Sequence, residues 1–233
     1  MNGSNSVKRI VLMRVLGLVA VGAAVLVFLA VNSCMNSLKR QPQDQAEEKA
    51  SSPEAGKRPT SEESGQIVEK HKDKVAVIET SSGTIKFKFY PEDAPRTVDN
   101  FVQLAEKQFY NGSPFHRIVK DFVIQTGSPD GSPGGGPGYT IAAEFSERKH
   151  VAGTVAMARK SDPDSAGSQF YICVKATPHL DGSYTVFGQV VEGMDVVNRI
   201  AETQTDADSR PLERIVMESV SIEDSAESAT PEQ

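Results

Sequence analysis

The sequence has no tryptophan, only two cysteines and only four histidines, and these scarcities limit the kinds of site that it can carry. Cys34 lies at the end of an apolar run and Cys173 lies inside a predicted strand, so we do not expect a framework of disulfide bonds. The histidines and cysteines show no spacing typical of metal ligands, so we expect no metal site. The four histidines are His71, His116, His150 and His179.

The chain also lacks an excess of positive charge. Its 25 Lys and Arg residues are outnumbered by 31 Asp and Glu residues, which gives a formal net charge of −6. Binding to a phosphate backbone requires a basic face, so we do not expect nucleic acid to be a partner. Hydrophobic residues are few and unevenly spread, and a length of 233 residues allows one large domain or two small ones.

The longest apolar run is Val15 to Val31, which contains no charged residue and follows several basic ones. A helix of this length spans about 25 Å, slightly less than the ~30 Å core of a membrane. The run is nevertheless longer than the ~7–15-residue apolar region of a cleaved signal peptide. We therefore expect residues 1–35 to be an N-terminal export signal or membrane anchor, with a buried core helix as the alternative.

Three fates of this segment remain open. No Ala-x-Ala site follows Val31, which favours a retained anchor over cleavage and secretion. The sequence VNSC, ending at Cys34, loosely resembles a lipoprotein processing site, so lipidation at Cys34 is an alternative. Basic residues before the run favour a cytoplasmic N-terminus and place the rest of the chain on the extracytoplasmic, or periplasmic, side.

Composition divides the remainder of the chain into three parts. Residues 36–71 are rich in Gln, Glu, Ser, Lys and Pro and contain no aromatic residue, so they are predicted to be a disordered linker. Residues 224–233 show the same composition and are predicted to be a disordered tail. One domain is expected between them, at residues 72–223.

Alternating hydrophobicity predicts a mostly β domain. Eight strands are expected, at residues 75–80, 84–90, 115–119, 122–127, 154–158, 169–174, 186–191 and 214–222. Apolar residues at helical spacing predict one helix that begins at Pro95, where a missing N–H costs nothing, and another near 193–201. A mostly antiparallel sheet of this size can lose its edges by closing into a barrel, although the periodicity also allows a sandwich.

Two motifs that suggest other chemistry do not fit their families. The glycine-rich segment GSPDGSPGGGPGY at residues 127–139 lacks the Lys-Ser/Thr of a phosphate-binding loop and contains three prolines, which favours a wide surface turn. Ser168 lies in AGSQF rather than in Gly-x-Ser-x-Gly, so a serine hydrolase is not expected.

Three strand segments are too polar to be plain core. They read FHRIV at residues 115–119, FVIQTG at 122–127 and GSQFYIC at 167–173, and they place a guanidinium, amides and aromatic rings among β-branched residues. In this order they resemble the signature of cyclophilins, the peptidyl-prolyl cis/trans isomerases, and the resemblance extends from about Lys74 to Glu223. The variant residues and the apolar N-terminus resemble a bacterial, membrane-anchored member.

The resemblance implies a closed eight-stranded antiparallel barrel with a helix over each end. It also implies an isomerase that accelerates rotation about Xaa–Pro bonds in exported proteins and so assists folding outside the cytoplasm. Such an enzyme needs no cofactor, takes proline-containing polypeptides as substrates and is expected to be a monomer. The alternative is a chaperone or scaffold module that binds proline-containing segments with little turnover.

The chemistry of the reaction identifies the catalytic candidates. Amide resonance sets a barrier of about 18–20 kcal/mol, and a fixed cationic donor aimed at the prolyl nitrogen binds best when the amide is twisted. Arg117 matches the catalytic arginine of the family motif and has the rigid, permanently charged group that this role requires. Its alternative role is a surface strand arginine paired with a carboxylate. Gln125 is expected to bind the substrate backbone or to hold Arg117 in position.

The remaining site residues are expected to bind substrate. By motif match, an apolar proline pocket is lined by Phe122, Val123, Tyr171 and Leu180, although Phe122 and Leu180 could also be plain core. The other candidates are Gln169, the strand segment Ala158–Arg159, His179 and Tyr184. Four of these positions depart from animal relatives: His179 replaces Trp, Tyr184 replaces His, Arg159 replaces Asn and Val123 replaces Met. Cyclosporin binding is therefore expected to be possible but weakened.

Overall fold

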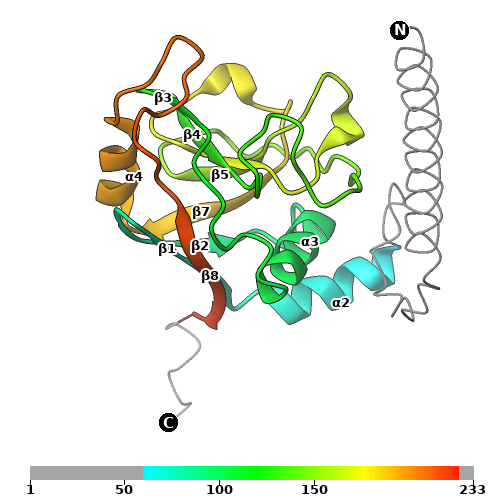
Figure 1. Ribbon diagram of the computed structural model, residues 1–233. Coiled ribbons are helices and arrows are strands. Elements are labelled where there is room, and N and C mark those ends of the chain that lie inside the picture. Colours follow the sequence, from blue (N-terminus) through cyan, green and yellow to red (C-terminus); the bar gives the residue numbers. More distant parts are fainter. Residues whose placement is uncertain (1–59, 226–233) are drawn as a thin grey trace, which may run out of the picture. The chain divides into compact units, whose positions relative to one another are not determined.

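The structure is a computed structural model, and it describes residues 60–225 of the chain (Figure 1). The anchor expected at residues 1–35, Cys34 and most of the expected linker lie outside these residues. No helix within residues 60–225 is long and apolar enough to cross a membrane.

Eight antiparallel strands form one sheet, as predicted. Their order across the sheet is β3-β4-β6-β5-β7-β2-β1-β8. Each strand lies within about three residues of the range expected from the alternating pattern. The strands are β1 (Lys74–Thr80), β2 (Gly83–Phe89), β3 (Arg117–Val119), β4 (Val123–Thr126), β5 (Thr154–Met157), β6 (Phe170–Cys173), β7 (Val186–Glu192) and β8 (Met217–Asp224).

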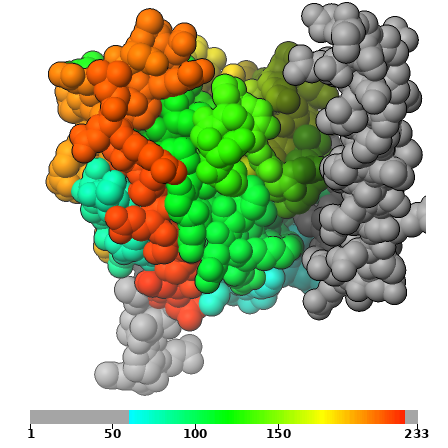
Figure 2. All heavy atoms as spheres, in the orientation of Figure 1, coloured from blue at the N-terminus to red at the C-terminus, as the bar shows by residue number. Residues whose placement is uncertain are grey.

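The expected closed barrel is wrong in one respect, because no ladder joins the edge strands β3 and β8. The segments that precede β3 and β8 are joined by an isolated bridge between Pro114 and Val216 and by a hydrogen bond from the Phe115 N–H to the Ile215 carbonyl at 2.9 Å. Met217 also accepts from the Gly112 N–H at 2.7 Å and donates to the Ser113 carbonyl at 2.9 Å. Pro114 has no N–H to donate and β3 is only three residues long, so these bonds do not form a ladder between β3 and β8. The two segments lie side by side in Figure 2, in green and in orange-red, and the barrel stays open there.

Residues 60–225 contain three α-helices, one more than expected for this part of the chain. The predicted helices are α3 (Pro95–Glu106) and α4 (Met194–Ala201), and two short 3₁₀ helices cover Pro163–Ser165 and Pro178–Leu180.

The additional helix is α2 (Ser61–His71), which corrects the prediction that residues 61–71 belong to a disordered linker. Thr60 and Glu63 form a reciprocal capping box at its start. At its end, buried His71 lies 3.0 Å from Asp99 of α3, so α2 packs beside α3 (Figure 1). Composition missed this helix because its signal is the short Thr-x-x-Glu pattern inside a polar segment.

The alternation of side chains along the strands separates the buried residues into two clusters. Ile124 of β4 and Ile172 of β6 point into the main core, which α3 and α4 also fill. Val123 and Tyr171, each one residue away, point to the opposite side and join a smaller apolar cluster. One face of these strands therefore packs into the main core and is called the structural face. The residues of the candidate site lie on the opposite face, with the smaller apolar cluster.

Candidate functional site

Strand register brings the polar motif residues into one row. Arg117 of β3 pairs directly with Gln125 of β4, and Gln125 pairs in turn with Tyr171 of β6. Tyr171 then pairs with Ala156 of β5. Because directly opposed residues share a face of the sheet, the guanidinium, the amide and the phenol all lie on the face of the smaller apolar cluster.

Arg117 and Phe122 lie together at one side of this row. The guanidinium carbon of Arg117 is 6.0 Å from the centroid of the Phe122 ring, and the other neighbour of that ring is the stacked imidazole of His179, at 5.5 Å. Within residues 60–225, no carboxylate forms an ion pair with Arg117. The surface ion-pair role considered for this arginine therefore has no support, and its charge is available to a ligand.

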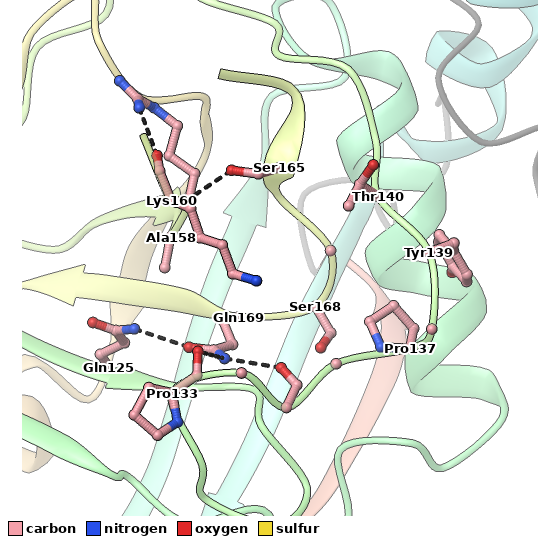
Figure 3. Close-up of a pocket in the computed structure, with 16 residues that line it drawn as sticks. Gln125, Pro133, Pro137, Tyr139, Thr140, Ala158, Lys160, Ser165, Ser168 and Gln169 are labelled. Carbon is pink, nitrogen blue, oxygen red and sulfur yellow. Dashed lines mark hydrogen bonds between the residues drawn. The ribbon is translucent and has the colours of Figure 1, made fainter. Parts of the chain in front are cut away.

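The two glutamines of the motifs hydrogen-bond to each other. Gln125 Nε2 donates to Gln169 Oε1 at 3.0 Å, and Gln169 Nε2 donates to the carbonyl oxygens of Gly135 at 2.9 Å and of Pro133 at 3.2 Å (Figure 3). The loop thus fixes Gln169, and Gln169 fixes Gln125. No hydrogen bond joins the side chains of Gln125 and Arg117.

The residues that the sequence predicts as the lining of a proline pocket meet in the smaller apolar cluster. Val123 and Tyr171 are buried within it, and Phe122, Leu180 and Tyr184 pack against it while half-buried. Phe122 and Leu180 are therefore not part of the main core, which was the alternative for both. The Tyr171 and Tyr184 rings meet edge to face with centroids 5.9 Å apart, which gives this pocket a rigid aromatic wall.

Arg159 acts on the backbone around the pocket. Its Nε and Nη2 donate to the carbonyl oxygen of Ser183 at 3.1 and 2.9 Å, and its Nη1 donates to the carbonyl oxygen of Lys160 at 2.8 Å. The guanidinium carbon also lies 4.7 Å from the centroid of the Tyr184 ring. The side chain therefore ties the segment after β5 to the segment that carries Tyr184. Ala158, which precedes it, is half-buried at the edge of the pocket.

Beyond the glutamine pair lies a cavity of about 360 Å³ that the sequence analysis did not find. Its walls are the glycine-rich loop at 133–140, the segment 158–160 and residues 165–169, and none of these residues is acidic. The Lys160 side chain points into it toward Gln169 and Ser168 (Figure 3). Lys160 Nζ has no ion-pair partner among the described residues. The glycine run, read only as a wide turn, was the signal for this cavity.

Comparison with known proteins agrees with this geometry. A family model described as "Cyclophilin type peptidyl-prolyl cis-trans isomerase/CLD" matches residues 75–222. A peptidyl-prolyl cis-trans isomerase of Synechococcus elongatus is 48% identical over 114 residues, which are 49% of this chain and 78% of that protein. One of Helicobacter pylori is 44% identical over 131 residues, 54% of this chain and 80% of that protein.

Solved structures show the same similarity. A crystal structure of a Cryptosporidium parvum cyclophilin-type peptidyl-prolyl cis-trans isomerase, determined in the presence of the dipeptide Ala-Pro, aligns with a TM-score of 0.62 and 30% identity. The alignment covers 64% of this chain and 98% of that one.

Lys160, which has no ion-pair partner among the described residues, predicts that peptide binding depends on the charge of the peptide. Peptides with Glu within three residues of proline should bind more tightly than the same peptides with Lys, and Lys160→Glu should reverse the order. We expect a change of about two- to fivefold in Kd, because the ammonium is exposed and partly screened. Fluorescence anisotropy at low and high salt measures this change. Lys88→Glu, at an exposed position outside the cavity, is the control, and an unchanged preference in Lys160→Glu contradicts the prediction.

Proposed function

The chain is a peptidyl-prolyl cis-trans isomerase of the cyclophilin family, and we propose that it accelerates rotation about Xaa–Pro bonds in exported polypeptides. The observation that carries the site assignment is the row Arg117–Gln125–Tyr171, in which a guanidinium with no ion pair to any residue of 60–225 lies beside the smaller apolar cluster, which we take as the proline pocket. In this assignment the pocket holds the proline ring, and the row acts on the peptide bond that precedes it.

The geometry suggests how this chain lowers the rotational barrier. As the amide twists, the lone pair of the prolyl nitrogen leaves conjugation and becomes a hydrogen-bond acceptor. The Arg117 guanidinium donates to it in that state, and this stabilises the twisted amide more than either planar isomer. Gln125, whose amide is fixed by Gln169, binds the backbone of the substrate and keeps the bond in place. Neither a covalent intermediate nor a cofactor takes part.

The rival function is a module that binds proline-containing segments without turnover. The absence of a carboxylate partner for Arg117 within residues 60–225 favours the enzyme, because a module that only binds proline has no use for an unpaired cation at the pocket edge. Exchange spectroscopy by NMR on an Ala-Pro-containing peptide separates the two. The enzyme at catalytic concentration accelerates cis/trans exchange, whereas a binding module shifts the peptide resonances and leaves the exchange rate unchanged.

The first variant to test is Arg117→Ala. An acceleration of ~10⁵-fold corresponds to about 7 kcal/mol of preferential stabilisation of the twisted state, and the guanidinium is expected to supply much of it. The change should lower kcat/KM at least about 100-fold and leave Tm within about 2 °C, since the side chain is half-buried and forms no ion pair with the residues that the structure describes. Arg117→Lys should be almost as poor, because a lysine lacks the rigid fork.

The control for Arg117→Ala is Arg214→Ala, which removes an exposed arginine from the loop before β8 and should leave kcat/KM unchanged. Full activity in Arg117→Ala would exclude the proposed mechanism.

We also propose that cyclosporin inhibits this enzyme weakly. His179 stacks on Phe122 with ring planes 21° apart, and an imidazole offers less apolar area there than an indole does. His179→Trp should therefore lower the inhibition constant, whereas Leu212→Trp, at an exposed position in the loop before β8, should not. An inhibition constant that does not respond to His179→Trp means that the segment around His179 does not contact the drug.

The export part of the proposal depends on residues 1–35, which lie outside the described residues. The apolar run from Val15 to Val31 supports a retained anchor, with the isomerase domain on the extracytoplasmic side. A retained anchor leaves full-length protein in membranes after salt and carbonate washes. Lipidation leaves a shorter membrane-bound form that is lost in Cys34→Ser. Soluble mature protein that begins after Val31 contradicts the anchor.

A further inference from the structure

Hydrogen-bonded side chains form a polar chain that leads from Tyr171 of the smaller apolar cluster through buried His150 to half-buried Asp181. The Tyr171 hydroxyl lies 3.1 Å from His150 Nε2, and His150 Nδ1 lies 3.1 Å from Asp181 Oδ1. The same carboxylate oxygen accepts a bond from the His150 backbone N–H at 2.8 Å. The imidazole is 1% exposed and lies nearly parallel to the Tyr171 ring, so solvent does not reach the link between the two side chains.

The partners of the chain determine where its protons are. Hydrogen bonds from His150, the backbone N–H first, hold the pKa of Asp181 below its usual range, so its carboxylate is ionised and only accepts. The imidazole therefore carries its proton on Nδ1. Burial lowers the pKa of His150, which keeps the ring neutral at neutral pH and leaves a lone pair on Nε2. The Tyr171 hydroxyl donates to that lone pair.

The hydroxyl has no comparable partner in its cluster. The other buried members are Val123, Ala156, Cys173 and Val186, and none of their side chains carries oxygen or nitrogen. A buried hydroxyl without a partner is costly, so the bond to His150 selects one orientation of the Tyr171 ring among those that packing allows. That ring packs edge to face against Tyr184 and faces the same side of the sheet as Arg117 and Gln125.

We propose that His150 and Asp181 are positioning residues of this isomerase: through the hydroxyl of Tyr171 they hold the phenol ring as a fixed wall of the proline pocket. This rests on the proposed function of the pocket. Neither residue touches the substrate, so both act on substrate binding and not on the twisting step. The twisted amide is stabilised by Arg117, which forms no hydrogen bond with Tyr171, His150 or Asp181.

The hydrogen bonds among Tyr171, His150 and Asp181 also make substrate binding sensitive to acid. A protonated His150 donates from both nitrogens, and the Tyr171 hydroxyl then loses its acceptor. Because the folded-state pKa of His150 is lowered, this happens only below the ordinary histidine range, under about pH 6.5. KM should therefore be constant near neutral pH and rise in acid. The other titratable or charged groups around the chain are Asp181, Lys149, His179, Tyr184, Arg159 and Cys173.

A double-mutant cycle between His150 and Tyr171 tests the proposal. His150→Asn keeps a donor toward Asp181 and removes the acceptor of Tyr171, whereas Tyr171→Phe removes the hydroxyl itself. Each should raise KM roughly fivefold, the value of about one hydrogen bond, with kcat within about twofold of the wild type. The double variant should match the single variants, because both changes break the same link.

The control is Tyr110→Phe, which removes a buried phenol hydroxyl from the main core and should leave KM unchanged. Effects on KM that multiply in the double variant, or an unchanged KM in His150→Asn, overturn the proposal. If His150→Asn does not fold, Tyr171→Phe alone decides, because the proposal requires that change to raise KM. NMR exchange measurements at pH 5–8 give kcat and KM without a coupling protease. Tyr171→Phe should lack the rise of KM in acid.

A second measurement does not depend on activity. Long-range proton–nitrogen NMR correlations report which imidazole nitrogen carries the proton, and we expect the Nδ1–H form for His150 in the wild type. The Nε2–H form would mean that His150 donates to Tyr171, which overturns the proposal. If the wild type shows no isomerisation, the proposed function fails, and the imidazole result still decides whether the chain of bonds exists.

Discussion

The site depends on the register between β3, β4 and β6. Arg117, Gln125 and Tyr171 share one face only because each is directly opposite the next across antiparallel ladders. If the register of β4 slipped by one residue, its side chains would change faces. The Gln125 amide would then enter the main core, and Ile124 would face the candidate site. Hydrophobic burial of Ile124 and Ile172 on the structural face resists that slip. The same packing that stabilises the fold therefore sets the geometry of the row that we propose to be catalytic.

Around that row, polar side chains are fixed by backbone groups and seldom by charges. Gln169 is held by carbonyl oxygens of the glycine-rich loop, and Arg159 is held by those of Ser183 and Lys160. Carbonyl oxygens orient a side chain without neutralising a cation completely, so the site keeps a positive potential inside a protein of net charge −6. Among the described residues, Arg117 differs from Arg159 in having neither an ion pair nor a hydrogen bond from its side chain, and this is the property that the proposed mechanism requires.

Sequence reasoning succeeded where the signal was local. The eight strands, α3 and α4 follow from alternation and from Pro95, and motifs of five to seven residues point to side chains that share one face of the sheet. It failed where the cause was not local. The open seam depends on Pro114 meeting Val216 across the sheet, and α2 depends on a cap inside a linker-like composition. The polar chain joins positions 150, 171 and 181, none of which looks unusual in its own segment. Residues 1–35 stay a prediction.

The arrangement also explains how Tyr can occupy a pocket that must be apolar. A hydroxyl that faced the proline ring would require solvent or a substrate partner, and either would weaken the binding of an apolar ring. Here the hydroxyl is bonded to buried His150, so in the proposed site the substrate would meet only the phenol ring. The polar group is thereby placed on the protein side of the wall, where its bond adds rigidity. A pocket held in this way needs little reorganisation when the substrate arrives, which favours a binding site that is already formed before the amide begins to twist.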